Sequence, residues 1–253
     1  MDPVAVKILL VNVNTSTAAT DAMVATGRRA ADPGTEIVGV TPEFGSTGVD
    51  SNTQSLLAAV AVMAAVTAYT APFDAVVLAG FGEHGREALQ ELLEVPVVDI
   101  AEAAVHVAMM LGRTFSIVTT LPRSAAQVED RLLLNGLRSR CVSLRSVGLS
   151  TRQLDADPTM TQAVIISAAT AAVEVDGAEV VVLGCGGMAG LSQLVSAQVG
   201  VPVVDGVATA VVLAEALVRL GLRSSSRGSC APPDLSATAP WPPRLLPADN
   251  GQR

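Results

Sequence analysis

Two kinds of hydrophobic pattern alternate along the chain. Short segments that are apolar throughout, as strands buried on both faces are, lie at residues 6–11, 75–78, 95–98, 115–119, 180–183 and 201–204. Longer Ala-rich stretches between them predict helices at 17–30, 55–69, 86–93, 101–111, 125–137, 161–176, 191–199 and 207–220. A further strand is expected at 142–147. Strands that alternate with helices favour parallel sheets with helices on both faces, so the sequence predicts an α/β fold.

The second half of the chain repeats the first. A strand, a Gly-rich turn, a helix, the sequence VPVVD and an Ala-rich helix follow one another in residues 74–112 and again in 179–221. A shift of 105 residues aligns Gly80 with Cys185. The repeat predicts two pseudo-symmetric lobes, one made of residues 1–105 and 206–222 and the other of residues 106–205. Because ligands of open α/β sheets bind at the carboxyl ends of strands, the active site is expected between the lobes.

Composition and charge narrow the functional classes. The 253 residues carry a net charge of −8 and a single lysine, so nucleic-acid binding has no electrostatic support. The sequence has neither an apolar stretch of transmembrane length nor a secretory signal, so no membrane partner and a cytoplasmic location are expected. Three scattered cysteines suit neither a disulfide framework nor a metal site. Residues 223–253 hold 6 of the 14 prolines and are expected to form a disordered tail.

Cys185 is the first candidate for chemistry. It ends a predicted buried strand and precedes Gly186 and Gly187 at a helix start. Backbone N–H groups and the positive end of a helix dipole favour the thiolate there. The alternative is a small buried side chain without chemistry, as free cysteines usually are. The glycines favour a functional role, because they allow a ligand to approach the backbone closely.

A second Gly-rich turn, residues 80–85, matches the dinucleotide pattern G-x-G-x-x-G. Nicotinamide binding is nevertheless disfavoured, because Glu83 would place negative charge beside the phosphates, and no cofactor is expected. His84 in this turn is the histidine expected to reach a ligand, whereas His106 is expected to lie in the core. Phe81 is a candidate for stacking on a substrate ring.

Polar turns follow the first strand of each half. Asn12 and Asn14 follow one of these strands, and Thr119 and Thr120 end the other. Each turn could simply cap a helix, since Asn, Ser and Thr are favoured there. Each could also hold a carboxylate or an imide through amide and N–H groups.

These segments together resemble the hydantoin racemases of the aspartate/glutamate racemase superfamily. The similarity spans about residues 6–222 and rests on NVNTST, VVLAGFGEHG, VPVVDIAEAAVHVA, FSIVTTLPR and DGAEVVVLGCGGMAG followed by VPVVDGV. It implies a cofactor-independent homo-oligomeric enzyme acting on a small molecule, either a hydantoin-like imide or a small carboxylate. In that family one thiolate removes a proton beside a carbonyl, and a second thiol protonates the opposite face of the enolate. The resemblance places the second cysteine at Cys185 and substrate-binding groups in the two polar turns and the Gly-rich turns.

The sequence departs from the family at Gly80, where the first cysteine falls. One interpretation is a racemase or epimerase in which His84 or Glu83 replaces the thiol. A second is one-sided chemistry as in the arylmalonate decarboxylases, which look similar in having glycine here and a single cysteine that protonates an enolate. A third is a binding protein without catalysis. We predict the first, an isomerase of the racemase type in which Cys185 is the acid and base.

Overall fold

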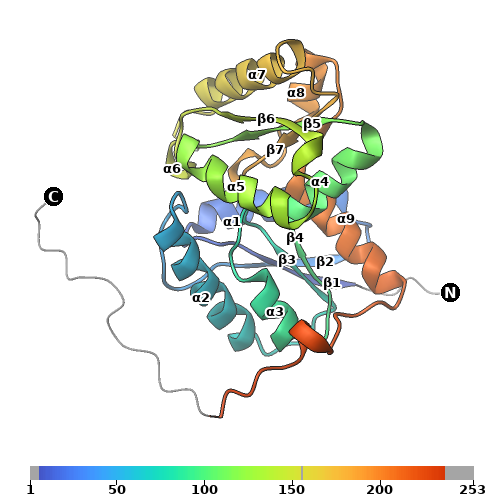
Figure 1. The fold of residues 1–253 in the computed structure, drawn as a ribbon. Helices are drawn as coiled ribbons and strands as arrows, with labels where there is room; N and C mark the ends of the chain where they lie inside the picture. Colours follow the sequence, from blue (N-terminus) through green and yellow to red (C-terminus); the bar gives the residue numbers. More distant parts are fainter. Residues whose placement is uncertain (1–5, 155, 237–253) are drawn as a thin grey trace, which may run out of the picture.

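The computed structural model describes residues 6–154 and 156–236 and contains two four-stranded parallel sheets (Figure 1). The first sheet has the order β2-β1-β3-β4, with β1 (Lys7–Val11), β2 (Glu36–Val40), β3 (Ala75–Leu78) and β4 (Val97–Asp99). The second has the order β6-β5-β7-β8, with β5 (Phe115–Thr119), β6 (Cys141–Ser146), β7 (Val180–Leu183) and β8 (Val203–Asp205). The predicted α/β fold with two pseudo-symmetric lobes is therefore confirmed.

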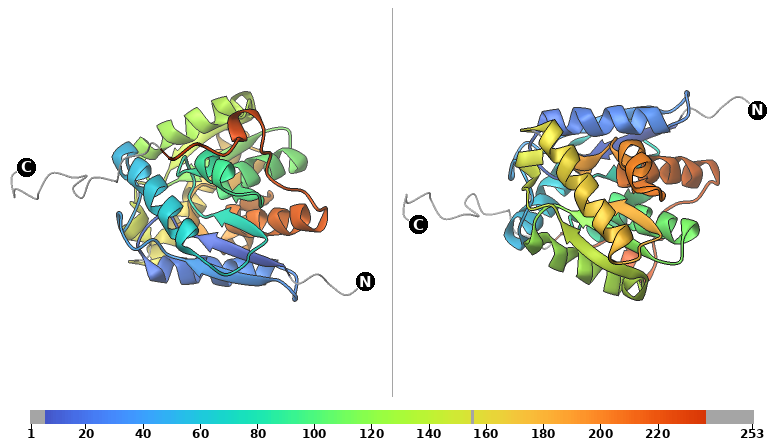
Figure 2. Two further views of the ribbon diagram at one scale, coloured as in Figure 1. Left: turned by 90° about the horizontal axis from the view of Figure 1, so that it is seen from below. Right: turned by 90° about the horizontal axis from the view of Figure 1, so that it is seen from above.

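Helices cover both faces of each sheet. In the first lobe α1 (Thr17–Ala30) and α9 (Gly206–Arg219) pack on one face, and α2 (Asn52–Ala68) and α3 (Arg86–Leu92) on the other. In the second lobe α4 (Ile100–Leu111) and α5 (Pro122–Leu134) pack on one face, and α7 (Pro158–Glu174) and α8 (Ser192–Val199) on the other. A short helix, α6 (Thr151–Leu154), precedes α7. Figure 2 looks onto α2 and α3 from below and onto α7 and α8 from above.

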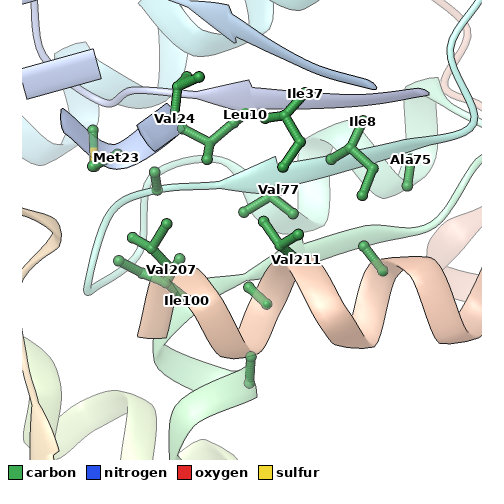
Figure 3. Close-up of a cluster of buried hydrophobic side chains, with 14 of the residues drawn as sticks. Ile8, Leu10, Met23, Val24, Ile37, Ala75, Val77, Ile100, Val207 and Val211 are labelled. Atoms are coloured by element: carbon green, nitrogen blue, oxygen red, sulfur yellow. The ribbon is translucent and has the colours of Figure 1, made fainter. Parts of the chain in front are cut away.

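Alternate side chains of each strand pack against the helices on opposite faces of the sheet, because successive side chains of a strand point to opposite faces. Ile8 and Leu10 of β1 pack with Val207 and Val211 of α9, as Figure 3 shows. The strand residue between them, Leu9, belongs to the core under α2 and α3. Each sheet is therefore buried on both faces, which explains why its central strands are apolar without interruption.

The internal repeat reappears in the strand register. Val76 of β3 pairs with Val97 of β4, and Val181, 105 residues further along, pairs with Val203 of β8. The two lobes thus share one pairing scheme as well as one sequence pattern.

The aspartate of each VPVVD segment ends a strand and caps the next helix. Asp99 accepts hydrogen bonds from the backbone N–H groups of Ala101 and Glu102 at the start of α4. Asp205 does the same at the start of α9. Aspartate is favoured at this position because its carboxylate satisfies N–H groups that have no partner within the helix.

The two capped helices cross between the lobes. α4 follows the first sheet but contacts β7 and β8, whereas α9 follows the second sheet but contacts β3 and β4. Their starts approach closely, since a Cβ atom at Gly206 would lie only 2.7 Å from the carbonyl oxygen of Ile100. The lobe boundaries at residues 105 and 206 stay a prediction.

The sequence pattern missed one strand, β2, which lies at the edge of the first sheet. Only Ile37 of its five residues is buried, so the segment lacks the apolar run that marks the other strands. Of the predicted tail, residues 223–236 are described, and the backbone N–H of Ser224 donates to the carbonyl of Glu94 at 3.0 Å. Residues 237–253 lie outside the described residues. No helix in the described part of the chain is long and apolar enough to cross a membrane.

Candidate active site

A cleft lies between the lobes where β1, β3, β5 and β7 end. The first lobe contributes the sequence-predicted residues Asn12, Asn14, Gly80, Phe81 and His84, and the second lobe contributes Thr119, Thr120, Cys185, Gly186 and Gly187. The structure thus brings together every predicted site residue except Glu83. Segments far apart in the chain meet here because parallel strands place all their carboxyl ends on one side of a sheet.

The remaining lining residues were not predicted from the sequence. They are Val13, Ala19, Met23, Val49, Ala79, Ser124, Gln127, Thr151 and Gly184. No Asp, Glu, Lys or Arg is among the described residues that line the cleft. A bound carboxylate would therefore have to be held by N–H and O–H groups alone, whereas a neutral polar ring would need no counter-charge.

Cys185 lies at the second-lobe side of the cleft, directly after β7. Its Sγ accepts a hydrogen bond from the backbone N–H of Gly187 at 3.4 Å and caps a 3₁₀ turn, Gly186–Met188. An N–H donor directed at sulfur stabilises negative charge on it. A Cβ atom at Gly186 would lie 2.8 Å from Sδ of Met23 in the first lobe. Glycine at this position therefore lets the cysteine turn sit close against the opposite lobe.

Gly80 is the repeat partner of Cys185, and the space beside it is already occupied. A Cβ atom at Gly80 would lie 2.2 Å from Cδ2 of His84 and 2.5 Å from Cγ1 of Val13. The imidazole of His84 therefore fills the position that a side chain at residue 80 would take. Directly after His84 the chain enters α3 through Gly85, the N-cap of that helix, whose φ of +92° favours glycine.

His84 is almost fully buried, with 3% of its surface exposed. Burial, and after it the positive charge of Arg131, lowers the pKa of the imidazole to about 4, so the ring is neutral near neutral pH. Its Nδ1 lies 3.0 Å from Oγ of Ser55 in α2. Sequence reasoning missed Ser55, because it is one polar position in an Ala-rich helix 29 residues away from His84.

Glu83 points elsewhere although it adjoins His84. Its carboxylate forms an ion pair with Arg131 of α5 at 2.7 Å and accepts a hydrogen bond from the backbone N–H of Gly85 at 2.8 Å. Burial, and after it a hydrogen bond with Glu87, raises the pKa of Glu83 to about 7 in spite of the arginine. Glu83 therefore joins the Gly-rich turn to the second lobe and does not line the cleft.

Asn14 presents an amide donor at the cleft. Its Oδ1 accepts hydrogen bonds from Nδ2 of Asn12 at 3.0 Å and from the backbone N–H of Ser16 at 2.9 Å. Because a backbone N–H can only donate, this contact settles which end of the amide is the oxygen. Nδ2 of Asn14 has no hydrogen-bond partner within the described residues, so it is available to a ligand.

Two further contacts join the lobes at the rim of the cleft. Oγ1 of Thr151 donates to Asp50 at 3.0 Å, and Nε2 of Gln127 donates to Asn52 at 2.5 Å.

The expectation that His106 lies in the core is wrong: it is exposed on α4, where its Nδ1 lies 2.8 Å from the carbonyl oxygen of Glu102. Its side chain lies on the exposed side of α4, away from the buried residues that pack into the core.

Comparisons with known proteins agree with this architecture. The chain is 51% identical to a solved allantoin racemase from Pseudomonas fluorescens, with a TM-score of 0.88, and the match covers 95% of this chain and 100% of that one. A solved allantoin racemase from Klebsiella pneumoniae is 38% identical, with a TM-score of 0.86 over 90% of this chain and 94% of that one. A hydantoin racemase from Paenarthrobacter aurescens is 34% identical over 229 residues, which cover 90% of this chain and 97% of that protein.

More distant solved structures share the fold. Unliganded arylmalonate decarboxylase is 18% identical, with a TM-score of 0.57 over 84% of this chain and 92% of that one.

The family model described as Asp/Glu/Hydantoin racemase matches residues 8–214, which include every residue of the cleft. The chain therefore belongs to the Asp/Glu/Hydantoin racemase family of isomerases.

Proposed function

We propose that this protein interconverts the enantiomers of a 5-substituted hydantoin by moving the proton at C5 of the ring. The observation that carries the proposal is the pairing of His84 with Cys185. The two groups lie on opposite lobes at positions related by the internal repeat. The imidazole of His84 fills the space beside Gly80, and Gly80 is the repeat partner of Cys185, which carries the thiol. Racemisation needs an acid and a base on opposite faces of one carbon, and this pair supplies both.

In the proposed reaction, His84 starts as the neutral imidazole and Cys185 as the thiol. The neutral imidazole of His84 takes the C5 proton from one enantiomer, and the electron pair passes to the adjacent carbonyl oxygen as an enolate. The thiol of Cys185 then donates its proton to the opposite face of C5. The site is left with an imidazolium and a thiolate, which carry out the same reaction in reverse on the other enantiomer.

The cleft supports a neutral imide better than a carboxylate. Its described lining carries no formal charge, and a buried carboxylate without a cation is costly unless several donors compensate. The amide of Asn14 and the hydroxyl of Thr120 are suited to a ring carbonyl or its enolate oxygen. The names of the relatives, allantoin and hydantoin racemases, support the same substrate class, since allantoin is itself a substituted hydantoin.

The experiment incubates the wild-type protein with each enantiomer of allantoin and of a 5-benzyl hydantoin in deuterated water. Polarimetry follows the loss of rotation, and proton NMR follows the loss of the C5 proton, against a protein-free blank for spontaneous racemisation. We expect loss of rotation that keeps pace with exchange. Exchange with retained rotation would contradict a two-sided mechanism. Carbon dioxide release from a disubstituted aryl malonate, without any reaction of hydantoins, would favour the decarboxylase alternative.

A further inference from the structure

The donor and the acceptor can be assigned in the contact between Ser55 and His84. Oγ of Ser55 lies 2.5 Å from the carbonyl oxygen of Glu83 and 3.0 Å from Nδ1 of His84. A carbonyl oxygen can only accept, and two oxygens approach this closely only when a hydrogen lies between them. The single hydroxyl proton of Ser55 is therefore directed at Glu83.

The second contact of Ser55 must then run in the other direction. Its hydroxyl oxygen has no further proton to donate, so it accepts one from Nδ1 of His84. A neutral imidazole carries only one N–H, and here that N–H is at Nδ1. The other ring nitrogen, Nε2, keeps its lone pair and has no hydrogen-bond partner among the described residues.

The surroundings leave this nitrogen accessible from the cleft. His84 is one of the lining residues, and a Cβ atom at Gly82 would lie 3.1 Å from Nε2. Glycine at position 82 therefore avoids a side chain that would crowd the nitrogen. Among the charged groups around this turn, Glu83 pairs with Arg131 at 2.7 Å, and Arg131 also pairs with Glu87 at 3.0 Å.

We propose that Ser55 is a positioning residue that holds His84 as the Nδ1–H tautomer and so presents an unprotonated Nε2 to the substrate. This inference rests on the proposed function, because it gives His84 the role of the base opposite Cys185. Ser55 itself does not line the cleft: it acts through the imidazole, from the first turns of α2. Because Ser55 also donates to the carbonyl oxygen of Glu83, its two hydrogen bonds fix the orientation of the imidazole relative to the backbone of the turn.

The direct test is nitrogen NMR of protein labelled with ¹⁵N-histidine, which reports the tautomer without any need for turnover. The chain has only two histidines, so a His106→Gln variant assigns the signals. We expect the Nδ1–H form alone for His84 in the wild type and a mixture with the Nε2–H form in Ser55→Ala. Thr53→Ala is the matched control, because Thr53 is an exposed hydroxyl residue in the same part of α2. An Nε2–H form in the wild type, or an unchanged tautomer in Ser55→Ala, would overturn the proposal.

Kinetics supply the second readout. We expect Ser55→Ala to lower kcat for racemisation at least about tenfold with little change in KM, since the substrate does not touch the serine. Ser55→Thr, which keeps the hydroxyl, should recover most of the loss, and Thr53→Ala should behave as wild type. A rise in KM at unchanged kcat would contradict a positioning role. Failure of the proposed function would show itself separately, as a wild-type protein that keeps the Nδ1–H tautomer but racemises no hydantoin.

Discussion

The two lobes are built on one plan but present different side chains to the cleft. They share the strand order, the corresponding register of β3–β4 and β7–β8, and a capping aspartate, Asp99 in one lobe and Asp205 in the other. At the cleft, however, Cys185 of the second lobe corresponds to Gly80 of the first, and the imidazole of His84 fills the space beside that glycine. We infer that a site of this family can keep side chains on both sides of the cleft although one of them comes from another position in the chain. The sequence alignment of the repeat detects the glycine but not its replacement.

Removal of the Cys185 thiol from the second lobe should have the largest effect on racemisation. Cys185→Ala should lower racemisation by about 10²- to 10⁴-fold, the usual contribution of a general acid or base. Cys141→Ala is the matched control, because burial raises the pKa of the Cys141 thiol to about 11 and the residue lies outside the cleft. Polarimetry of both variants, with thermal unfolding to verify the fold, makes the comparison. A Cys185→Ala variant as active as Cys141→Ala would remove the thiol from the mechanism.

The matching change in the first lobe adds a side chain at Gly80. Gly80→Ala should displace His84 and Val13, destabilise the protein by about 1–3 kcal/mol through overpacking, and lower racemisation. Gly34→Ala is its control, because a Cβ atom there would meet nothing within 4 Å. Denaturant unfolding and initial rates are the measurements. A stable and fully active Gly80→Ala variant would show that the imidazole is not held where the mechanism needs it.

Glu83 and His84 form a comparison within a single turn. Glu83→Gln removes a charge that pairs with Arg131 at 2.7 Å, on a side chain that is 44% exposed and outside the cleft. It should therefore keep most of the racemase activity and cost at most about 1 kcal/mol of stability. His84→Gln should lose racemisation. Equal losses in the two variants, with both proteins folded, would return Glu83 to the list of catalytic candidates.

The smallest expected effect is in the acid limb of the pH profile. The neutral form of His84 is the proposed base and its pKa is lowered to about 4 by burial, so kcat/KM should hold below neutral pH and fall only as pH approaches about 4. A carboxylate base at Glu83, with its pKa raised to about 7, would instead lose activity just below neutral pH. Circular dichroism at each pH separates titration from unfolding. A decline centred near pH 7 would speak against His84.

Local pattern predicted most of the fold, because strands buried on both faces and Ala-rich helices leave a clear signal along the chain. It failed where burial is one-sided, as in β2, where only Ile37 is buried. The shared VPVVD motif likewise predicted the repeat of strand and helix, whereas the helix caps formed by Asp99 and Asp205 became visible only in the structure.

Several residues of the candidate site that lie in turns after a strand, such as Asn14 and Cys185, were predicted from the sequence. Ser55, by contrast, could not be predicted in this way. Its partner His84 lies outside α2, and no local sequence pattern marks the pair. Val13 likewise approaches Gly80 from a distant part of the chain, since a Cβ atom at Gly80 would lie 2.5 Å from its Cγ1. Such side-chain packing depends on how the elements meet, so it became visible only in the folded chain.

The most direct test of the two-sided site is the stereochemistry of exchange in two variants. His84→Gln and Cys185→Ala are each incubated in deuterated water with the separate enantiomers of a 5-benzyl hydantoin, and the C5 proton and the rotation are followed together. Each variant retains one reacting group, so each should exchange only the enantiomer whose proton faces that group, with retention of configuration. We expect opposite enantiomers for the two variants. Exchange of the same enantiomer by both, or full racemisation by His84→Gln, would contradict it.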